Sequence, residues 1–222
     1  MVTSPPAADA GRPKLRADAE RNRLRILEAA RELFAERGLD VTLDDVASHA
    51  GVGVGTVYRR FANRDELIVG VLTEHLARVA EAARGALDSP DPWQAVVDLL
   101  TLMASSMATD RGLAAVIMQI DHSHPDIEAT KAVLTTQLTQ VYERAKAAGV
   151  LRPELASTDF FGVLTMLAAI GEKTEPIVPG AWQRYLELIL DGIRADGRVE
   201  FTVPALTDDQ IREIQRRKKS QR

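Results

Sequence analysis

The side chains of this sequence that could do chemistry gather in the segment VGVGTVYRRF, residues 52–61. Positions four apart share one side of a helix, so Val57 and Phe61 face inward together. The outer side then carries hydroxyl and guanidinium groups, with an aromatic ring at its edge: Thr56, Arg59, Arg60 and Tyr58. Such groups donate hydrogen bonds to anions and to the polar edges of a partner, so the segment predicts non-covalent recognition.

Covalent and metal chemistry have little support. There is no cysteine, which excludes disulfides, thiolate catalysis and cysteine-ligated metal sites. No serine-centred elbow, phosphate loop or paired-histidine motif is present, so we expect neither an enzyme nor a cofactor. The loop QIDHSHPDIE is open to three interpretations: a plain solvated loop, the polar rim of a ligand cavity, or a metal site. The metal site is the least favoured because it needs three or four converging ligands, and the candidates are Asp121, His122, His124 and Asp126.

Helical patterns on both sides would position the recognition segment. An apolar stripe predicts a helix over residues 21–37, which Gly38 ends. Thr42 opens a short second helix, with Asp45 at the capping-box position, and Gly51 ends it. This order is the layout of a helix-turn-helix unit, whose second helix lies in the major groove of DNA. Two short helices also occur in plain bundles, so spacing alone leaves both interpretations open.

Two glycines at the start of the third helix, Gly53 and Gly55, suit a backbone that DNA approaches closely. Each lowers helix propensity by about 1 kcal/mol. Asn63 then caps a fourth helix, with Glu66 at the capping-box position, and this helix continues to about Leu87.

The remainder of the chain shows helical patterns punctuated by proline and glycine, so we predict an all-α fold. No run of residues predicts a strand. The expected helices cover residues 92–108, 112–120, 125–148, 157–173, 180–195 and 207–219.

Charge is distributed unevenly along the 222 residues, whose formal net charge is −4. Residues 1–70 are neutral overall, residues 71–206 carry −7 and residues 207–222 carry +3. A nucleic-acid surface would therefore be local to the N-terminal third. The longest uncharged stretch that could lie inside the fold has 12 residues, too few to span a bilayer, and the N-terminus lacks the apolar core of a secretory signal. We expect a cytoplasmic protein without a membrane segment.

The run ILEAARELFAERGLDVTLDDVASHAGVGVGTVYRRFANRDELI, residues 26–68, resembles the DNA-binding domain of the TetR/AcrR family. The GTVYRRF core followed by N-R-D-E-L is the specific part, and the run WQRYLELILDGIRA, residues 182–195, is similar to a late helix of that family. The resemblance implies a three-helix, helix-turn-helix DNA-binding domain followed by a larger helical ligand-binding and dimerisation domain. It also implies a homodimeric transcriptional regulator: a repressor of a near-palindromic operator in double-stranded DNA, released by a small, mostly apolar inducer. A helical protein-interaction module without DNA binding is the alternative.

The resemblance assigns DNA contacts residue by residue. The helix that follows Thr42 would bring its N-terminus to a phosphate, and Tyr58 would contact the DNA backbone. Arg59 would reach a guanine edge or a phosphate. Arg60 stands where histidine is common and Arg64 where lysine is usual, and both keep a positive charge. The full predicted DNA-binding set is Thr42, Val54, Gly55, Thr56, Tyr58, Arg59, Arg60 and Arg64.

Two further sets of residues are predicted in the C-terminal part. Soft apolar side chains at helical spacing indicate either ordinary core or the wall of a ligand cavity, in which a polar group would orient the ligand. The candidate ligand-binding residues are Met103, Met107, Gln119, Ile120 and His122. In the family, the last two major helices form the dimer interface, for which we expect Phe161, Leu164, Tyr185 and Leu188.

The predicted organisation has four parts. Residues 1–19 form a flexible arm, which is either a solvated tail or an arm that reaches phosphates. Residues 20–68 form the DNA-binding domain, and residues 69–206 form the ligand-binding and dimerisation domain. Residues 207–222 form a basic tail that we expect to be an extra helix.

Overall fold

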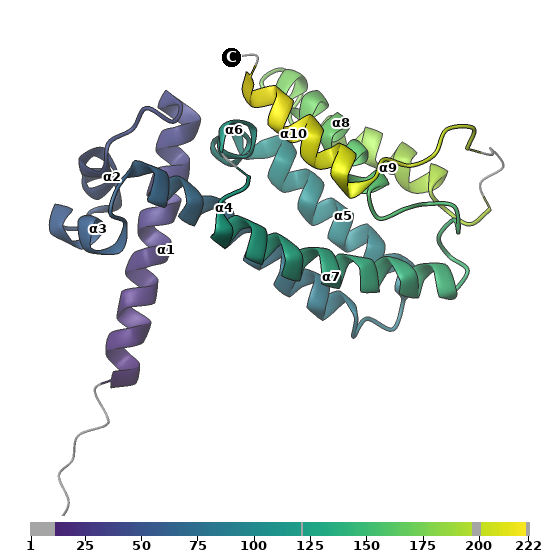
Figure 1. The fold of residues 1–222 in the computed structure, drawn as a ribbon, viewed down its shortest axis with the longest axis horizontal. Coiled ribbons are helices and arrows are strands. Elements are labelled where there is room, and N and C mark those ends of the chain that lie inside the picture. The colour runs from purple at the N-terminus through teal and green to yellow at the C-terminus, as the bar shows by residue number, and fades with distance from the viewer. Residues whose placement is uncertain (1–11, 121, 197–200, 221–222) are drawn as a thin grey trace, which may run out of the picture.

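The computed structural model describes residues 12–120, 122–196 and 201–220, and ten α-helices lie within these ranges (Figure 1). Outside the helices, the one strand-like pairing in the described part is an isolated bridge between Leu151 and Arg194, so the all-α prediction is confirmed. In chain order the helices are α1 (Arg12–Arg37), α2 (Leu43–Ala50), α3 (Val54–Arg60), α4 (Arg64–Ala86), α5 (Pro92–Thr109), α6 (Arg111–Gln119), α7 (Pro125–Ala147), α8 (Asp159–Thr174), α9 (Trp182–Gly192) and α10 (Asp208–Ser220).

The N-terminal arm is where the sequence prediction and the structure differ. The sequence predicts an unstructured segment over residues 1–19, whereas α1 begins at Arg12, so residues 12–19 are helical. Pro13 does not prevent this, because backbone N–H groups in the first turn of a helix have no intrahelical partner to lose. Residues 1–11 lie outside the described residues. The other predicted helix limits agree with the structure to within three residues.

The N-terminal helices pack around a hydrophobic cluster that we call the first cluster. It joins the inner faces of α1, α2 and α3 to the first half of α4. Helix α6 also belongs to it through Leu113 and Val116, although α6 follows α5 in the chain. Members exposed by 1% or less include Leu33, Phe34, Val46, Val57, Leu72 and Leu113.

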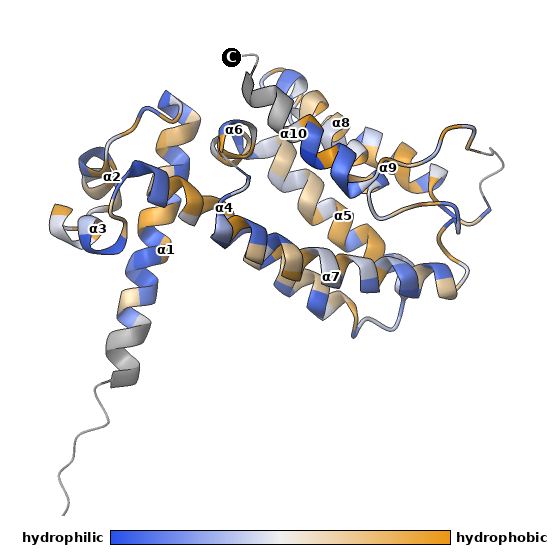
Figure 2. Ribbon diagram, viewed as in Figure 1, coloured by the Kyte–Doolittle hydropathy of each residue, from blue (hydrophilic) through white to orange (hydrophobic). Residues whose placement is uncertain are grey.

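The C-terminal helices pack around a second cluster. Helix α7 lies along α4, and α8 lies along α5 (Figure 1). The ring of Tyr142 on α7 stacks on Phe160 of α8 with a centroid distance of 4.0 Å. The longer helices carry both hydrophobic and hydrophilic residues along their length (Figure 2), as expected for helices that each bury one side.

Helix α4 is the element common to both clusters. Its first half contributes Leu67, Val71 and Leu72 to the first cluster, and its second half contributes Val79 and Ala83 to the second. One continuous helix therefore links the two hydrophobic cores.

Within the first cluster, α6 packs closely on α1. A Cβ added to Gly112 would lie 2.0 Å from the carbonyl oxygen of Arg31, far inside van der Waals contact. Beside this contact, the guanidinium of Arg31 forms an ion pair with Asp110 at 3.0 Å. Asp110 also caps α6, because its carboxylate accepts a hydrogen bond from the backbone N–H of Leu113 at 2.9 Å. The absent side chain at position 112 lets the two helices lie this close.

Among the described residues, no helix is both long enough and apolar enough to cross a membrane.

Buried His75 on α4 predicts a pH-dependent stability. Burial, together with the positive charges of Arg78 and Arg31, lowers the pKa of His75 to about 4. The unfolded chain takes up this proton near pH 6.5, so it binds more protons than the folded protein between about pH 6.5 and pH 4. We expect His75 to reduce the free energy of unfolding by about 3 kcal/mol as the pH falls across this window.

The measurement is urea unfolding at pH 7 and pH 4.5 for the wild type and for His75→Leu. The variant should lose less stability on acidification than the wild type, since the remaining carboxylates titrate in both. Equal losses would contradict the assignment.

Candidate nucleic-acid interface

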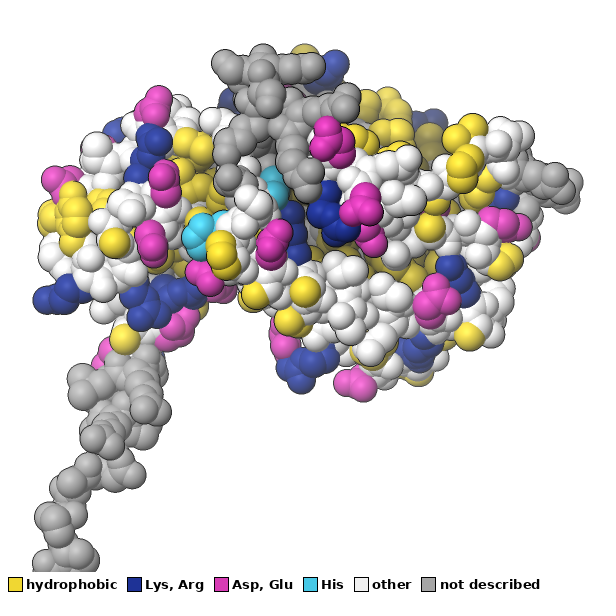
Figure 3. All heavy atoms as spheres, viewed as in Figure 1, with side chains coloured by type: hydrophobic (Ala, Val, Ile, Leu, Met, Phe, Trp, Pro, Cys, Tyr) yellow, Lys and Arg dark blue, Asp and Glu magenta, His cyan; other side chains and the backbone are white. Residues whose placement is uncertain are grey.

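The outward face of α3 has little role in the chain's own packing. Of the seven residues of this helix only Val57 is buried, and Phe61 anchors the following turn. Val54 is 44% exposed and Tyr58 is 50% exposed, although both are large hydrophobic or aromatic side chains. Thr56 accepts a 3.3 Å hydrogen bond from Arg59, which keeps two polar side chains together on the outer face. Space-filling atoms show hydrophobic side chains at the surface over α3 (Figure 3).

Helix α2 is held by a reciprocal capping box, as the sequence predicts. The backbone N–H of Asp45 donates to the hydroxyl of Thr42 at 3.1 Å, and the backbone N–H of Thr42 donates to the Asp45 carboxylate at 3.0 Å. Hydrogen bonds from the hydroxyl and backbone of Thr42 lower the pKa of Asp45. Asp44 adds a second carboxylate to this turn, and the two negative charges oppose a phosphate at the N-terminus of α2.

The turn between α2 and α3 depends on a left-handed residue. Gly51 has φ 62° and ψ 38°, and the following N–H of Val52 bonds to the carbonyl of Ala47 at 3.0 Å. From α1, the guanidinium of Arg25 donates to the last carbonyl of α2, on Ala50, at 2.8 Å. This turn fixes the angle at which α3 leaves α2, and Arg25 ties it to α1.

Nothing in the packing of the described residues requires a glycine at position 55. A Cβ at this position would meet nothing within 4 Å, and its φ is not positive. The fold therefore gains nothing that offsets the low helix propensity of glycine here. An external surface that approaches the backbone of α3 would account for it.

The structure places all eight predicted DNA-binding residues at or near the surface of α2, α3 and the start of α4. Two of their cations already have partners that sequence reasoning did not identify. Arg64 pairs with Asp40 at 2.8 Å, and Arg60 pairs with Glu20 at 3.4 Å. No local pattern could have revealed these contacts, because the partners are 24 and 40 residues apart in sequence.

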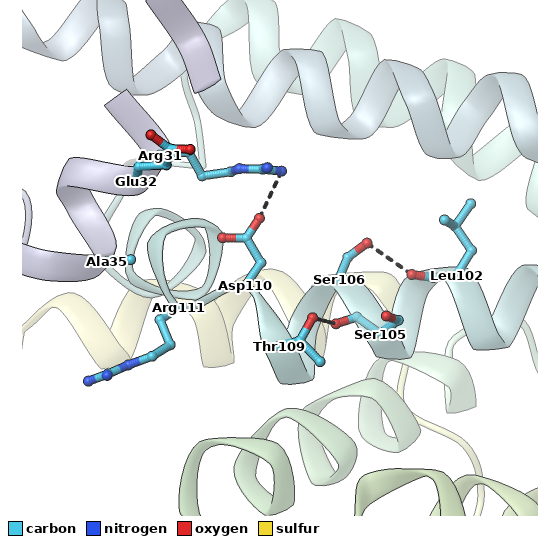
Figure 4. Close-up of a pocket in the computed structure, with 9 residues that line it drawn as sticks. All are labelled: Arg31, Glu32, Ala35, Leu102, Ser105, Ser106, Thr109, Asp110 and Arg111. Atoms are coloured by element: carbon cyan, nitrogen blue, oxygen red, sulfur yellow. Dashed lines mark hydrogen bonds and ion pairs between the residues drawn. The ribbon is translucent and has the colours of Figure 1, made fainter. Parts of the chain in front are cut away.

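A cleft of about 440 Å³ lies between α1 and the corner formed by α5 and α6 (Figure 4). The Arg31 side chain points across it to Asp110, and Arg111 points away. The hydroxyls of Ser106 and Thr109 donate to carbonyls of their own helix at 2.9 Å. Its lining residues are Arg31, Glu32, Ala35, Leu102, Ser105, Ser106, Thr109, Asp110 and Arg111.

None of the five predicted ligand-binding residues lines this cleft. Met103 packs against the second cluster, whereas Ile120 packs against the first, so these two lie on different cores. Met107 is partly buried on α5, and Gln119 is exposed at the end of α6. The positions of these residues do not test whether they bind a ligand, so the ligand site stays a prediction.

His122 is held by two contacts at the start of the α6–α7 connection. One ring nitrogen, Nε2, is 2.8 Å from the carbonyl of Ile117, and the other, Nδ1, is 3.0 Å from the ammonium of Lys131. Burial lowers the pKa of Lys131, and the nearby charge of Glu128 acts in the opposite direction. The side chain of His124 is engaged in capping α7, and Asp121 lies outside the described residues. No group of three ligating side chains that could hold a metal is found among the residues described.

The predicted dimerisation residues lie on α8 and α9, which pack together. Tyr185 and Leu188 on α9 are 42% and 60% exposed, and Met166 on α8 is 56% exposed. Phe161 and Leu164 are partly buried. The two helices therefore present large apolar side chains at the surface of the monomer, and the dimer interface stays a prediction.

Two family models match the chain. Residues 26–71 match the model described as "Bacterial regulatory proteins, tetR family", and residues 91–195 match "Transcriptional regulator SbtR-like, C-terminal domain". The chain is also 38% identical over 63 residues to an HTH-type transcriptional regulator of Staphylococcus aureus (strain USA300), a match that covers 28% of this chain. The chain spans about a third, 34%, of the length of such curated relatives.

Two solved structures are similar over nearly their whole length. A TetR transcription regulatory protein from Mycobacterium vanbaalenii is 31% identical, with a TM-score of 0.63 over 81% of this chain and 99% of that one. A TetR transcriptional regulator from Streptomyces coelicolor is 30% identical, with a TM-score of 0.62 over 79% of this chain and 99% of that one.

Two glycine substitutions should have opposite effects on stability. Gly55→Ala should raise the free energy of unfolding by about 0.5–1 kcal/mol, because alanine is the better helix former and the site is open. Gly112→Ala should lower it by about 1–3 kcal/mol, because the new methyl group would force α6 away from α1. Chemical denaturation of both variants measures the two effects, and each variant is the control for the other. A Gly112→Ala protein as stable as the wild type would mean that the two helices do not lie this close.

Proposed function

This chain belongs to the TetR family of bacterial regulatory proteins, and we propose that it acts as a homodimeric repressor that leaves its operator when a small molecule binds. Family membership makes it a DNA-binding transcriptional regulator and not an enzyme. Repression, dimerisation and release by an inducer are our proposal.

One observation supports DNA recognition most directly: α3 buries a single residue, Val57, and leaves all the others exposed except the partly buried Thr56. Val57 and the adjacent Phe61 fix the helix to the first cluster, and Gly51 sets its angle. A helix held so firmly while its outer face is left free is suited to the major groove. Thr56 would face base edges there, and Tyr58 would contact a phosphate.

Dimerisation accounts for the apolar side chains exposed on α8 and α9. Burying Met166, Tyr185 and Leu188 against the same residues of a second copy would form a two-fold interface. A symmetric dimer presents two recognition helices, which bind half-sites about 34–36 Å apart when the spacing is right. This pairing requires a near-palindromic operator.

Release by a ligand requires a second state of the dimer, in which the distance between the two recognition helices does not match the distance between the half-sites. A ligand that prefers this state lowers DNA affinity only by its differential affinity for the two states. We propose a small, mostly apolar ligand, bound in the C-terminal domain near Met103 and Met107, whose side chains are flexible and partly buried. In this proposal Ile120 would add to the apolar lining, and Gln119 or His122 would bind the polar end of the ligand.

Substitutions in α3 should separate base reading from backbone positioning. Tyr58→Phe should weaken binding about fivefold to all DNA sequences alike, because it removes one phosphate hydrogen bond of about 1 kcal/mol. Thr56→Ala should change the preferred operator variants. Binding to a randomised operator library measures both effects. A uniform loss of affinity in Thr56→Ala would place another residue at the bases, and a wild type with no sequence preference would favour an interaction module without operator recognition.

Charge placed on α9 should separate the subunits. Leu188→Glu should give a folded monomer in sedimentation and weaken operator binding about a hundredfold or more, because the second half-site no longer adds to affinity. Val133→Glu is the matched control: this residue is 55% exposed on α7, away from the predicted interface, and the variant should stay dimeric. If Leu188→Glu remained a dimer, the α8–α9 assignment would be wrong.

A further inference from the structure

A chain of ion pairs joins α4 to the end of the recognition helix. Glu74 on α4 lies 2.6 Å from the guanidinium of Arg23 on α1. The same guanidinium nitrogen lies 3.0 Å from one carboxylate oxygen of Glu20. The other oxygen of Glu20 lies 3.4 Å from the guanidinium of Arg60, the last residue of α3. Acidic and basic side chains lie side by side in the N-terminal part of the molecule (Figure 3).

The ion pair at the α4 end of this series is shielded from solvent, whereas the ion pair at the α3 end is exposed. The side chains of Arg23 and Glu74 are 20% and 23% exposed, so their short ion pair is largely shielded from solvent. The side chains of Glu20 and Arg60 are 53% and 46% exposed, and their pair is long. A shielded pair holds its geometry, whereas an exposed ion pair contributes little to stability and exchanges readily. Arg60 can therefore leave Glu20 for another anion at little cost.

The position of Arg60 decides which anion that would be. Val57 and Phe61 are both buried and fix the backbone on either side of Arg60. Only the side chain of Arg60 can therefore move from one anion to another. Among the described residues, Glu20 is the carboxylate within ion-pair distance of Arg60. A DNA phosphate offers the same guanidinium a competing anion with similar geometry.

We propose that Glu20 competes with DNA phosphates for Arg60, and that Arg23, anchored by Glu74, holds Glu20 in place to do so. Glu20 is thus a residue that sets DNA affinity without touching DNA, and its position depends on α4. This inference rests on the proposed operator binding. It predicts that Glu20 keeps the affinity for DNA below the value that the cations of α3 would give in its absence.

The test uses the full-length protein and a duplex bearing the sequence that the wild type selects from a random library. Fluorescence anisotropy over a series of salt concentrations gives both affinity and salt dependence. Glu20→Gln should bind about three- to tenfold more tightly, as expected from the loss of one exposed ion pair and one negative charge. The slope of log affinity against log salt should steepen by about 0.9, because one more phosphate is neutralised.

Two further variants make the assignment specific. Arg60→Gln should abolish the gain, so the double variant Glu20→Gln/Arg60→Gln should bind like Arg60→Gln alone. Glu28→Gln is the matched control: it removes a carboxylate from the same helix, one that pairs with Arg31 and not with α3, and should leave affinity and slope unchanged. Thermal unfolding verifies that all variants are folded.

The outcomes are distinct. An unchanged affinity in Glu20→Gln overturns the inference and leaves operator binding intact. A gain that persists without Arg60 overturns it too, because Glu20 would then act by general repulsion of DNA. A wild type that binds no duplex overturns both the inference and the proposed function.

Discussion

The architecture depends on one helix being buried in two cores. Helix α4 contributes Leu72 to the first cluster and Val79 to the second, within a single uninterrupted run of helical hydrogen bonds. Neither cluster can be completed without it, so the recognition unit and the helical bundle share their stability. Any rearrangement of the bundle that reorients α4 must also act on the cluster that carries α3. Coupling between the two parts thus follows from packing and needs no dedicated pathway.

Interactions between residues close in sequence shape the recognition unit, which consists of α1, α2 and α3. A reciprocal cap at Thr42 begins α2, a left-handed Gly51 ends it, and Val57 alone anchors α3 from within. Each of these interactions contributes little free energy, but together they hold α3 without using the side chains of its outer face. The side chains on that face are thereby available for an external partner. The unfavourable Gly55 is consistent with the same division between structure and recognition.

Features set by neighbours in the sequence could be predicted from it. The caps at Thr42 and Asn63, the stop at Gly51 and the inward Val57 all depend on residues a few positions apart, and the structure shows each of them. The helical start at Arg12 was not predictable from the apolar stripe, because that pattern begins only where α1 meets the cluster.

Features set by contacts distant in sequence could not be predicted. The pair of Arg60 with Glu20 and the cleft between α1 and the α5–α6 corner join segments whose meeting depends on the assembled fold. The sequence predicts Arg60 and Arg64 as DNA contacts, and both already have carboxylate partners in the folded chain.

The contact between Gly112 and the backbone of Arg31 has a mechanical consequence. Helices that touch backbone to backbone, with an ion pair beside the contact, cannot slide past each other without losing both, so this contact fixes α6 on α1. Between α5 and α6 the chain has a single non-helical residue, Asp110, with φ −93° and ψ 88°. Because the Asp110 side chain both pairs with Arg31 on α1 and caps α6, a single carboxylate ties the corner between α5 and α6 to α1.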